Sequence, residues 1–193
     1  MADEVKDSKI EFDPNDPRAP MPSAPMQYND DGTVAWGDMW DTYCMLALDG
    51  GPPHRGTLLT APTHADATYP QYLEVQREIV RGIKAVSGLD ATAGPPGWVA
   101  VEAGHAGYAH WLVTAITEEN VEAKRDGSHV LVPCGEYFTV KGEIKNVITA
   151  VAKTTHYWGE HVPAEVKQAS AAQAKMEDTV DKVKGFFGRI LGS

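Results

Sequence analysis

The sequence predicts one compact layered domain of the α/β or α+β class, with a small sheet, an extended acidic N-terminal arm and a C-terminal amphipathic heptad helix. Three observations support this prediction. Segments with helical spacing alternate with short apolar runs that are typical of strands. The two ends of the chain differ from this middle part in charge and in apolar periodicity. The length of 193 residues and the hydrophobic content of 42% suit a single ordinary domain with tails.

We expect three segments: an acidic, proline-rich arm (1–32), a core domain (33–162) and an amphipathic, coiled-coil-like helix (163–193). The arm carries eight acids against three bases, which is half of the net charge of −10, and five of the thirteen prolines. Proline is excluded from helix and sheet interiors, and the charge discourages collapse. Two alternatives follow for the arm: a disordered tail, or an extended segment that lies on a partner.

The first half of the core is expected to form a helix, a short strand and a second helix. From residue 36 to 47 the apolar residues recur at helical spacing, and a Gly-Pro run at 49–53 then stops the helix. Residues 57–60 suit a short strand. Residues 68–87 carry an apolar stripe with charged residues opposite, and Gly88 suits the stop of this helix.

The second half of the core is expected to continue the alternation. Residues 98–101 suit a buried strand, and residues 105–122 suit a central helix because they are apolar nearly all round. We expect residues 129–132 and 137–140 to form a hairpin, because a proline and a glycine lie between them. A last core helix is expected over 142–158.

The C-terminal segment has the most regular pattern in the chain. Eight positions alternate in steps of three and four, which is the a/d pattern of about three and a half heptads. These seam positions are Val166, Ala169, Gln173, Met176, Val180, Val183, Phe187 and Ile190. Such a face must be covered, since exposing it to water is unfavourable. Three surfaces could bury this face, and they are kept as alternatives: the chain's own domain, a copy or partner chain, or an anionic membrane surface.

Cys134 is the candidate nucleophile of the chain. It lies in a predicted tight turn, where backbone N–H groups lower a thiol pKa, and His105 or His156 would act as its base if the fold brought one of them close. The same three residues are the alternative metal ligands, and Glu102 or Glu143 would be the supporting carboxylate. No spacing enforces either arrangement, so a buried structural cysteine is the competing interpretation.

The histidines are not expected to pair along a helix. His105 and His110 are five residues apart, which is about 140° around a helix, and the same holds for His156 and His161. Neither pair should therefore share a helix face. Surface histidines, or histidines satisfied within the core, are the simpler interpretation.

No catalytic signature occurs between the two ends, which favours a non-catalytic accessory or assembly subunit of a multiprotein complex. It would dock through its N-terminal arm and its C-terminal helix onto another protein or a second copy. Trp36 and Trp40 share a helix face directly after the arm, where an exposed aromatic pair would suit an interface and burial is the alternative. The expected partner-binding residues are Trp36, Trp40, Met176, Val180, Val183, Phe187 and Ile190.

The alternative function is a small cytoplasmic enzyme or metal-binding domain that uses Cys134 with His105 or His156. No cofactor is predicted apart from the transition metal of this alternative. The acidic balance argues against nucleic-acid binding. The longest apolar runs are far shorter than a bilayer span, and the acidic start has no apolar signal region, so we expect a cytoplasmic protein without membrane spans.

Overall fold

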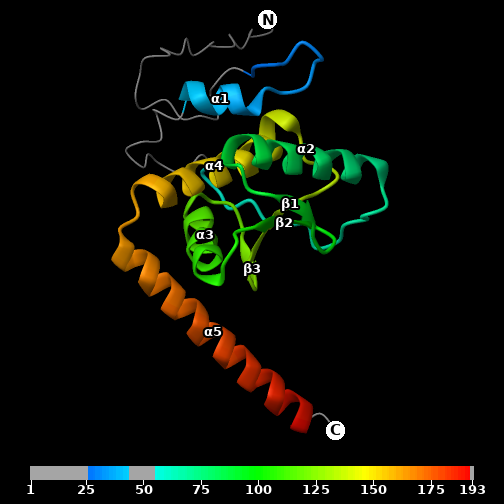
Figure 1. The fold of residues 1–193 in the computed structure, drawn as a ribbon. Helices are drawn as coiled ribbons and strands as arrows, with labels where there is room; N and C mark the ends of the chain where they lie inside the picture. The colour runs from blue at the N-terminus through cyan, green and yellow to red at the C-terminus, as the bar shows by residue number, and fades with distance from the viewer. Residues whose placement is uncertain (1–25, 44–54, 192–193) are drawn as a thin grey trace, which may run out of the picture.

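The computed structural model describes residues 26–43 and 55–191, with the side chains of residues 42, 43, 183 and 185–191 excepted (Figure 1). The chain has the α+β fold class that the sequence predicts. The elements are α1 (Trp36–Tyr43), α2 (Pro70–Ser87), β1 (Ala91–Ala93), β2 (Trp98–Glu102), α3 (Ala106–Glu118), β3 (Lys124–Asp126), β4 (His129–Pro133), a π-helical turn η3 (Val140–Ile144), α4 (Lys145–Glu160) and α5 (Ala164–Leu191).

The four strands form one antiparallel sheet in the order β1-β2-β4-β3. Valines alternate along the two central strands, so that Val99 pairs with Val132 and Val101 with Val130 on one face. All four are fully buried, because α2 packs on β1 and β2 while α3 packs on β3 and β4. Hydrophobic burial of this single face therefore organises the domain.

Helix α4 is the central helix of the structure. Its residues 147–154 are all buried, and it packs against both α2 and α3. The sequence places the central helix at residues 105–122 instead. In the structure that helix, α3, packs on α4, α5, β3 and β4 but leaves Thr114 and Thr117 exposed, so α4 is the more completely buried of the two.

The predicted hairpin between 129–132 and 137–140 does not form. Strand β4 is flanked by β2 on one edge and β3 on the other, so it has no edge left for a further strand. Its true hairpin partner is β3, joined by a two-residue turn in which Gly127 has φ +60°. Residues 137–140 instead turn into η3, with the Phe138 N–H donating to the Gly135 carbonyl at 3.0 Å. The expected strand at 57–60 is reduced to a single bridge, Leu59 with Val121.

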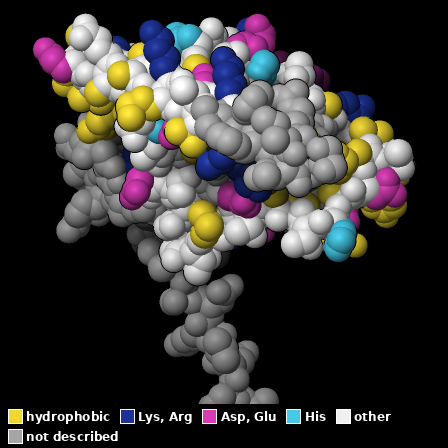
Figure 2. Space-filling model, turned by 90° about the horizontal axis from the view of Figure 1, so that it is seen from below, with side chains coloured by type: hydrophobic (Ala, Val, Ile, Leu, Met, Phe, Trp, Pro, Cys, Tyr) yellow, Lys and Arg dark blue, Asp and Glu magenta, His cyan; other side chains and the backbone are white. Residues whose placement is uncertain are grey.

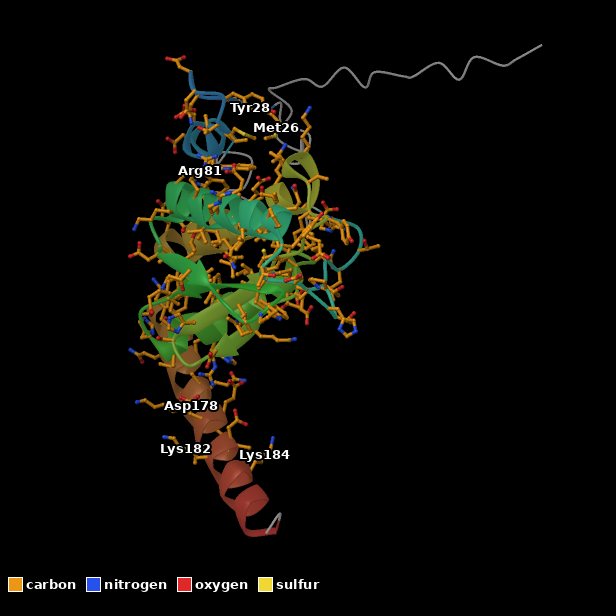
Figure 3. All side chains as sticks on the ribbon, turned by 90° about the vertical axis from the view of Figure 1, so that its right-hand side faces the viewer. Met26, Tyr28, Arg81, Asp178, Lys182 and Lys184 are labelled. Atoms are coloured by element: carbon orange, nitrogen blue, oxygen red, sulfur yellow. The ribbon has the colours of Figure 1, made fainter. Side chains whose placement is uncertain are left out.

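The chain just before α1 folds back onto the domain. Tyr28 bridges to Val34, and the Ala35 N–H donates to the Gln27 carbonyl at 2.9 Å. The Arg81 guanidinium of α2 donates to the Val34 carbonyl at 2.8 Å, which fixes this turn to the second helix (Figure 3). The rest of the predicted arm, residues 1–25, lies outside the described residues.

Helix α5 is the longest element, with 28 residues, and spans about 42 Å. It packs on α3 and then projects away from the body of the domain (Figure 1). Lys182 and Lys184 lie on the projecting part (Figure 3). No helix in the described residues is long and apolar enough to cross a membrane.

Candidate functional site

Helix α5 docks on α3 through small residues. Ser170 and Ala174 of α5 are buried at this contact, and Ala171 lies against Gly107 of α3. A Cβ atom on Gly107 would lie 2.8 Å from the Cα of Ala171, which is shorter than an ordinary carbon contact. The two helices therefore approach closely only because a glycine stands at position 107.

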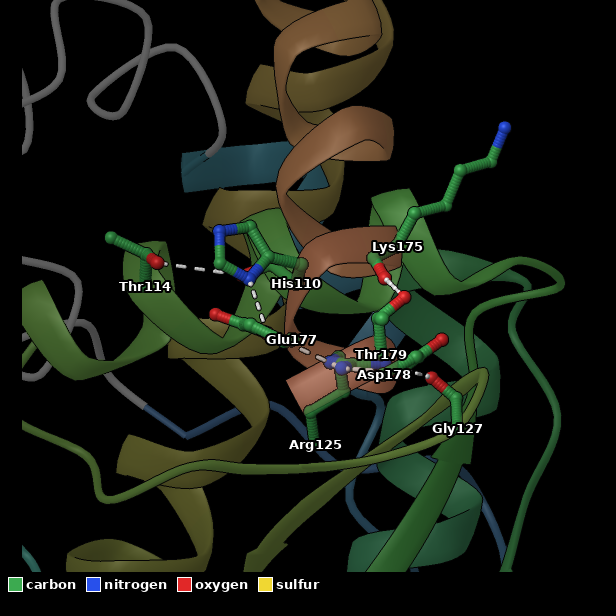
Figure 4. A network of polar contacts seen from close by, with 8 residues as sticks. All are labelled: His110, Thr114, Arg125, Gly127, Lys175, Glu177, Asp178 and Thr179. Carbon is green, nitrogen blue, oxygen red and sulfur yellow. Dashed lines mark hydrogen bonds and ion pairs between the residues drawn. The ribbon is translucent and has the colours of Figure 1, made fainter. Parts of the chain in front are cut away.

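Charged groups fix α5 one turn further along (Figure 4). Arg125 of β3, only 11% exposed, contacts Asp178 Oδ1 at 2.6 Å and Glu177 Oε2 at 3.2 Å. His110 of α3 lies 3.2 Å from the same Glu177 oxygen through its Nδ1 atom. Burial lowers the pKa of Arg125, but the contacts with Asp178 and Glu177 outweigh it, so the pKa is raised above its ordinary value. The network sets the rotation of α5 about its own axis.

This docking turns the predicted heptad seam outward. Val166 is 43% exposed, Met176 70% and Val180 49%. A groove of about 790 Å³ follows this face of α5 where it passes β3. Its lining includes Arg125, Ala169, Ala172, Gln173, Met176 and Val180. The side chains of Val183, Phe187 and Ile190, which continue the seam in the sequence, lie outside the described residues.

Exposed apolar surface alone does not mark this site. Seen from below, hydrophobic side chains reach the surface in several separate groups among charged and polar ones (Figure 2). Tyr137, at 86% exposed, shows that a large apolar side chain can stand alone on the surface. The α5 face differs because its exposed apolar residues recur at heptad spacing along one straight helix.

The tryptophan pair belongs to the core. Trp36 is 1% exposed, and its indole N–H donates to Glu78 Oε1 at 2.8 Å. Trp40 is 7% exposed and packs edge-on against His156, with ring centroids 6.0 Å apart. The structure thus places both side chains inside the domain, which is the alternative that the sequence leaves open, and neither is presented on the surface as an anchor.

Cys134 is a buried thiol. It follows β4, is 0% exposed, and has Tyr72 of α2 as a hydrogen-bond neighbour. Burial raises the pKa of Cys134 to about 11, and the Tyr72 contact offsets this only in part. A thiol of this kind is protonated at neutral pH and shielded from reagents, so it lacks the features of a nucleophile.

The structure does not bring Cys134 and His105 together. Cys134 follows the end of β4 that pairs with Trp98, whereas His105 follows the opposite end of β2. The two ends of the strand pair are about 13 Å apart. His105 caps α3 instead, and its Nδ1 accepts from the Tyr108 N–H at 3.1 Å.

The two candidate carboxylates are engaged elsewhere. Glu102 contacts His129 Nε2 at 2.7 Å on the solvent side of the sheet. Glu143 accepts from the Thr139 N–H at 2.9 Å at the start of η3. Neither of these contacts involves Cys134.

His105 and His156 lie on different sides of α4. The His105 ring contacts Trp158, with centroids 6.4 Å apart, whereas His156 contacts Trp40. Residues two apart on a helix point about 200° apart, so Trp158 and His156 face nearly opposite directions. The predicted set of Cys134, His105 and His156 is therefore not assembled as one site.

His156 instead meets His161, against the expectation from their spacing. Their ring centroids are 5.7 Å apart. The helical geometry that would separate them ends at Glu160, and His161 is the C-cap with φ −118° and ψ −21°. With Glu160, ligand atoms of the three side chains all lie within 4.8 Å of one another. The sequence argument assumed one uninterrupted helix and therefore missed that the helix ends between the two histidines.

Comparisons with known proteins add no relative: no family model, no curated protein and no solved structure matches the chain.

Proposed function

We propose that the protein is a cytoplasmic, non-catalytic accessory or assembly subunit that docks through the outward seam of α5. The observation that carries the proposal is the orientation of this helix. Small residues and the Arg125 network hold a neighbouring face of α5 on the domain, while Val166, Met176 and Val180 stay exposed. A rigidly held apolar face loses little further freedom on binding, which favours association.

A second copy of this chain is the occupant that the seam favours. Gln173 lies in the middle of the seam and is exposed. Its amide is both donor and acceptor, so it pairs with another Gln173 when two α5 helices lie parallel and in register. In the antiparallel arrangement that pairs all eight seam positions, Gln173 would face Val183 and its amide would lose its partners. An unsatisfied buried amide costs about 1–3 kcal/mol, so the seam favours the parallel pair.

The N-terminal arm is the second docking element of the proposal. Its composition supports this role, since residues 1–25 combine acids with prolines and lack an apolar pattern. Trp36 and Trp40 are not part of the proposed surface, because they fill the core.

Sedimentation velocity of the full chain over a range of concentrations tests the proposal. The wild type should run at twice 20.9 kDa. Replacing Met176 and Val180 with glutamate should give monomers, because four apolar side chains leave each dimer interface. At about 1 kcal/mol or more for each, the dimer weakens about a thousandfold.

The matched control is Lys175→Glu, an exposed residue next to Met176 but off the seam. It should keep the wild-type mass. A wild type that stays monomeric, or a Met176→Glu/Val180→Glu variant that keeps the dimer mass, contradicts docking through this face.

A further inference from the structure

We propose that His156, Glu160 and His161 form a binding site for a transition metal ion, with Zn²⁺ as the best fit, at the C-terminal end of α4. The three side chains offer two imidazole nitrogens and one carboxylate oxygen, all within 4.8 Å of one another. The site is separate from the α5 seam, so the result of a metal-binding test does not depend on the proposed docking function.

The geometry fits a small cation. Ligand atoms bound to Zn²⁺ at 2.0–2.1 Å in a tetrahedron are about 3.4 Å apart. His156 Nε2 and Glu160 Oε2 are 3.6 Å apart, which is close to this value. The largest distance between two of the ligand atoms, up to 4.8 Å, must shorten by little more than 1 Å to reach the distance found around Zn²⁺. Glu160 and His161 lie on the surface, where their side chains have room to make this rotation.

His156 supplies the second observation. Its Nε2 atom is buried and makes no hydrogen bond among the described residues, while its ring is only 19% exposed. A buried nitrogen without a hydrogen bond is costly in a folded protein. The Trp40 ring packs against the His156 ring, with centroids 6.0 Å apart, and the nitrogen lies 3.6 Å from Glu160 Oε2. A bound cation would satisfy it.

The ligand chemistry selects the metal. Imidazole nitrogens suit Zn²⁺, Cu²⁺ and Ni²⁺, whereas Mg²⁺ and Ca²⁺ prefer sets made of oxygen only. The C-terminal end of α4 also carries partial negative charge from its unpaired carbonyls, which favours a cation. Three protein ligands leave one tetrahedral position, which water or a residue of another chain would fill.

Titration calorimetry of the untagged, chelator-treated full chain is the direct test, with ZnCl₂ and MgCl₂ as the two probes. We expect one Zn²⁺ per chain and no heat from Mg²⁺. Thermal unfolding should shift upward with Zn²⁺, because at a hundredfold excess over Kd the unfolding equilibrium moves about a hundredfold toward the folded state. Co²⁺ should give the visible spectrum of a tetrahedral site.

His161→Gln and Glu160→Gln remove one ligand each at exposed positions, so the fold should be kept, and each should weaken Zn²⁺ binding at least about tenfold. His129→Gln is the matched control, since His129 also faces a carboxylate, Glu102 at 2.7 Å, but belongs to no three-ligand cluster among the described residues. It should bind Zn²⁺ as the wild type does. A wild type that does not bind Zn²⁺ overturns the proposal. So do ligand variants that bind it unchanged, or a control that loses as much affinity as they do.

Discussion

The close contact between α3 and α5 predicts that Gly107→Ala destabilises the chain. The new Cβ would lie 2.8 Å from the Cα of Ala171 and 3.0 Å from its backbone nitrogen. Ordinary contacts between carbon atoms are about 3.5–4.0 Å. Because the obstacle is backbone, α5 must move by about 1 Å as a body, and a side-chain rotation cannot relieve the clash.

The magnitude follows from two opposing effects. Overpacking of this kind costs about 1–3 kcal/mol, and replacing glycine by alanine in a helix returns up to about 1 kcal/mol. We expect a net loss of about 1 kcal/mol for Gly107→Ala. The matched control is Gly159→Ala in α4, where nothing lies within 4 Å of the new Cβ. It should gain about 0.5 kcal/mol, because only the helix propensity changes.

Urea unfolding of the two variants beside the wild type measures both effects. A shift of 1 kcal/mol corresponds to about 2–4 °C in Tm for a chain of this length, so thermal unfolding gives a second readout. Limited proteolysis should also cut α5 faster in Gly107→Ala. If both glycine variants gain the same stability, α5 is not packed on α3 as described.

Three further predictions concern charged and buried groups. Arg125→Ala should lose about 1–2 kcal/mol in urea unfolding and expose α5 to protease, because Asp178 then loses this partner while Glu177 keeps the His110 contact, and both carboxylates are partly solvated. Unchanged proteolysis would show that the network does not hold the helix. At pH 8, the Cys134 thiol should react with a disulfide reagent about a hundredfold more slowly in the folded than in the unfolded chain, because burial raises its pKa from 9.0 to about 11. The rates are measured in a Cys44→Ser background, and equal rates in the two states would refute the burial. Burial lowers the pKa of Lys145 from 10.5 to about 8, so between these values the unfolded chain holds a proton that the folded chain has lost. The free energy of unfolding of the wild type, relative to Lys145→Met, should therefore rise with pH from 8 to 10.5 by up to about 1.4 kcal/mol per unit, and a flat difference would contradict it.

Elements that carry their own burial pattern could be predicted from the sequence. The stripe of α2 is an example: Tyr72, Val75, Ile79 and Ile83 are all buried, and the helix ends at Gly88 with φ +71°. The valine runs of β2 and β4 are equally clear. Strands β1 and β3 could not be predicted, because Ala91–Ala93 is short and has no large apolar residue, and Lys124–Asp126 is charged throughout. They form because β2 and β4 offer them hydrogen-bonding edges, which is a tertiary effect.

The α5 pattern shows where apolar periodicity stops being informative. The sequence identifies the seam, but it does not say which face of the helix docks on the domain. That choice is made by small residues and charges, namely Gly107 against Ala171 and Arg125 against Asp178, none of which stands out in a hydrophobic pattern. The weaker apolar face is buried, and the stronger one is left exposed.

The prediction that His156 and His161 would lie apart was wrong for a local reason. The angle between His156 and His161 was worked out for an uninterrupted helix, but α4 ends at Glu160. Helix ends are uncertain by one or two residues even in known structures. An argument about shared faces is therefore weakest at the end of a helix, which is where these ligands lie.

Cross-linking through Gln173→Cys tests the outward seam most directly. In a parallel, in-register pair the two introduced thiols face each other, so mild oxidation of the full chain should give a disulfide-linked dimer of twice 20.9 kDa. Lys175→Cys, exposed but off the seam, and the wild type should stay monomeric on denaturing gels. The absence of a cross-linked Gln173→Cys dimer, or equal cross-linking at position 175, would contradict docking through this face of α5.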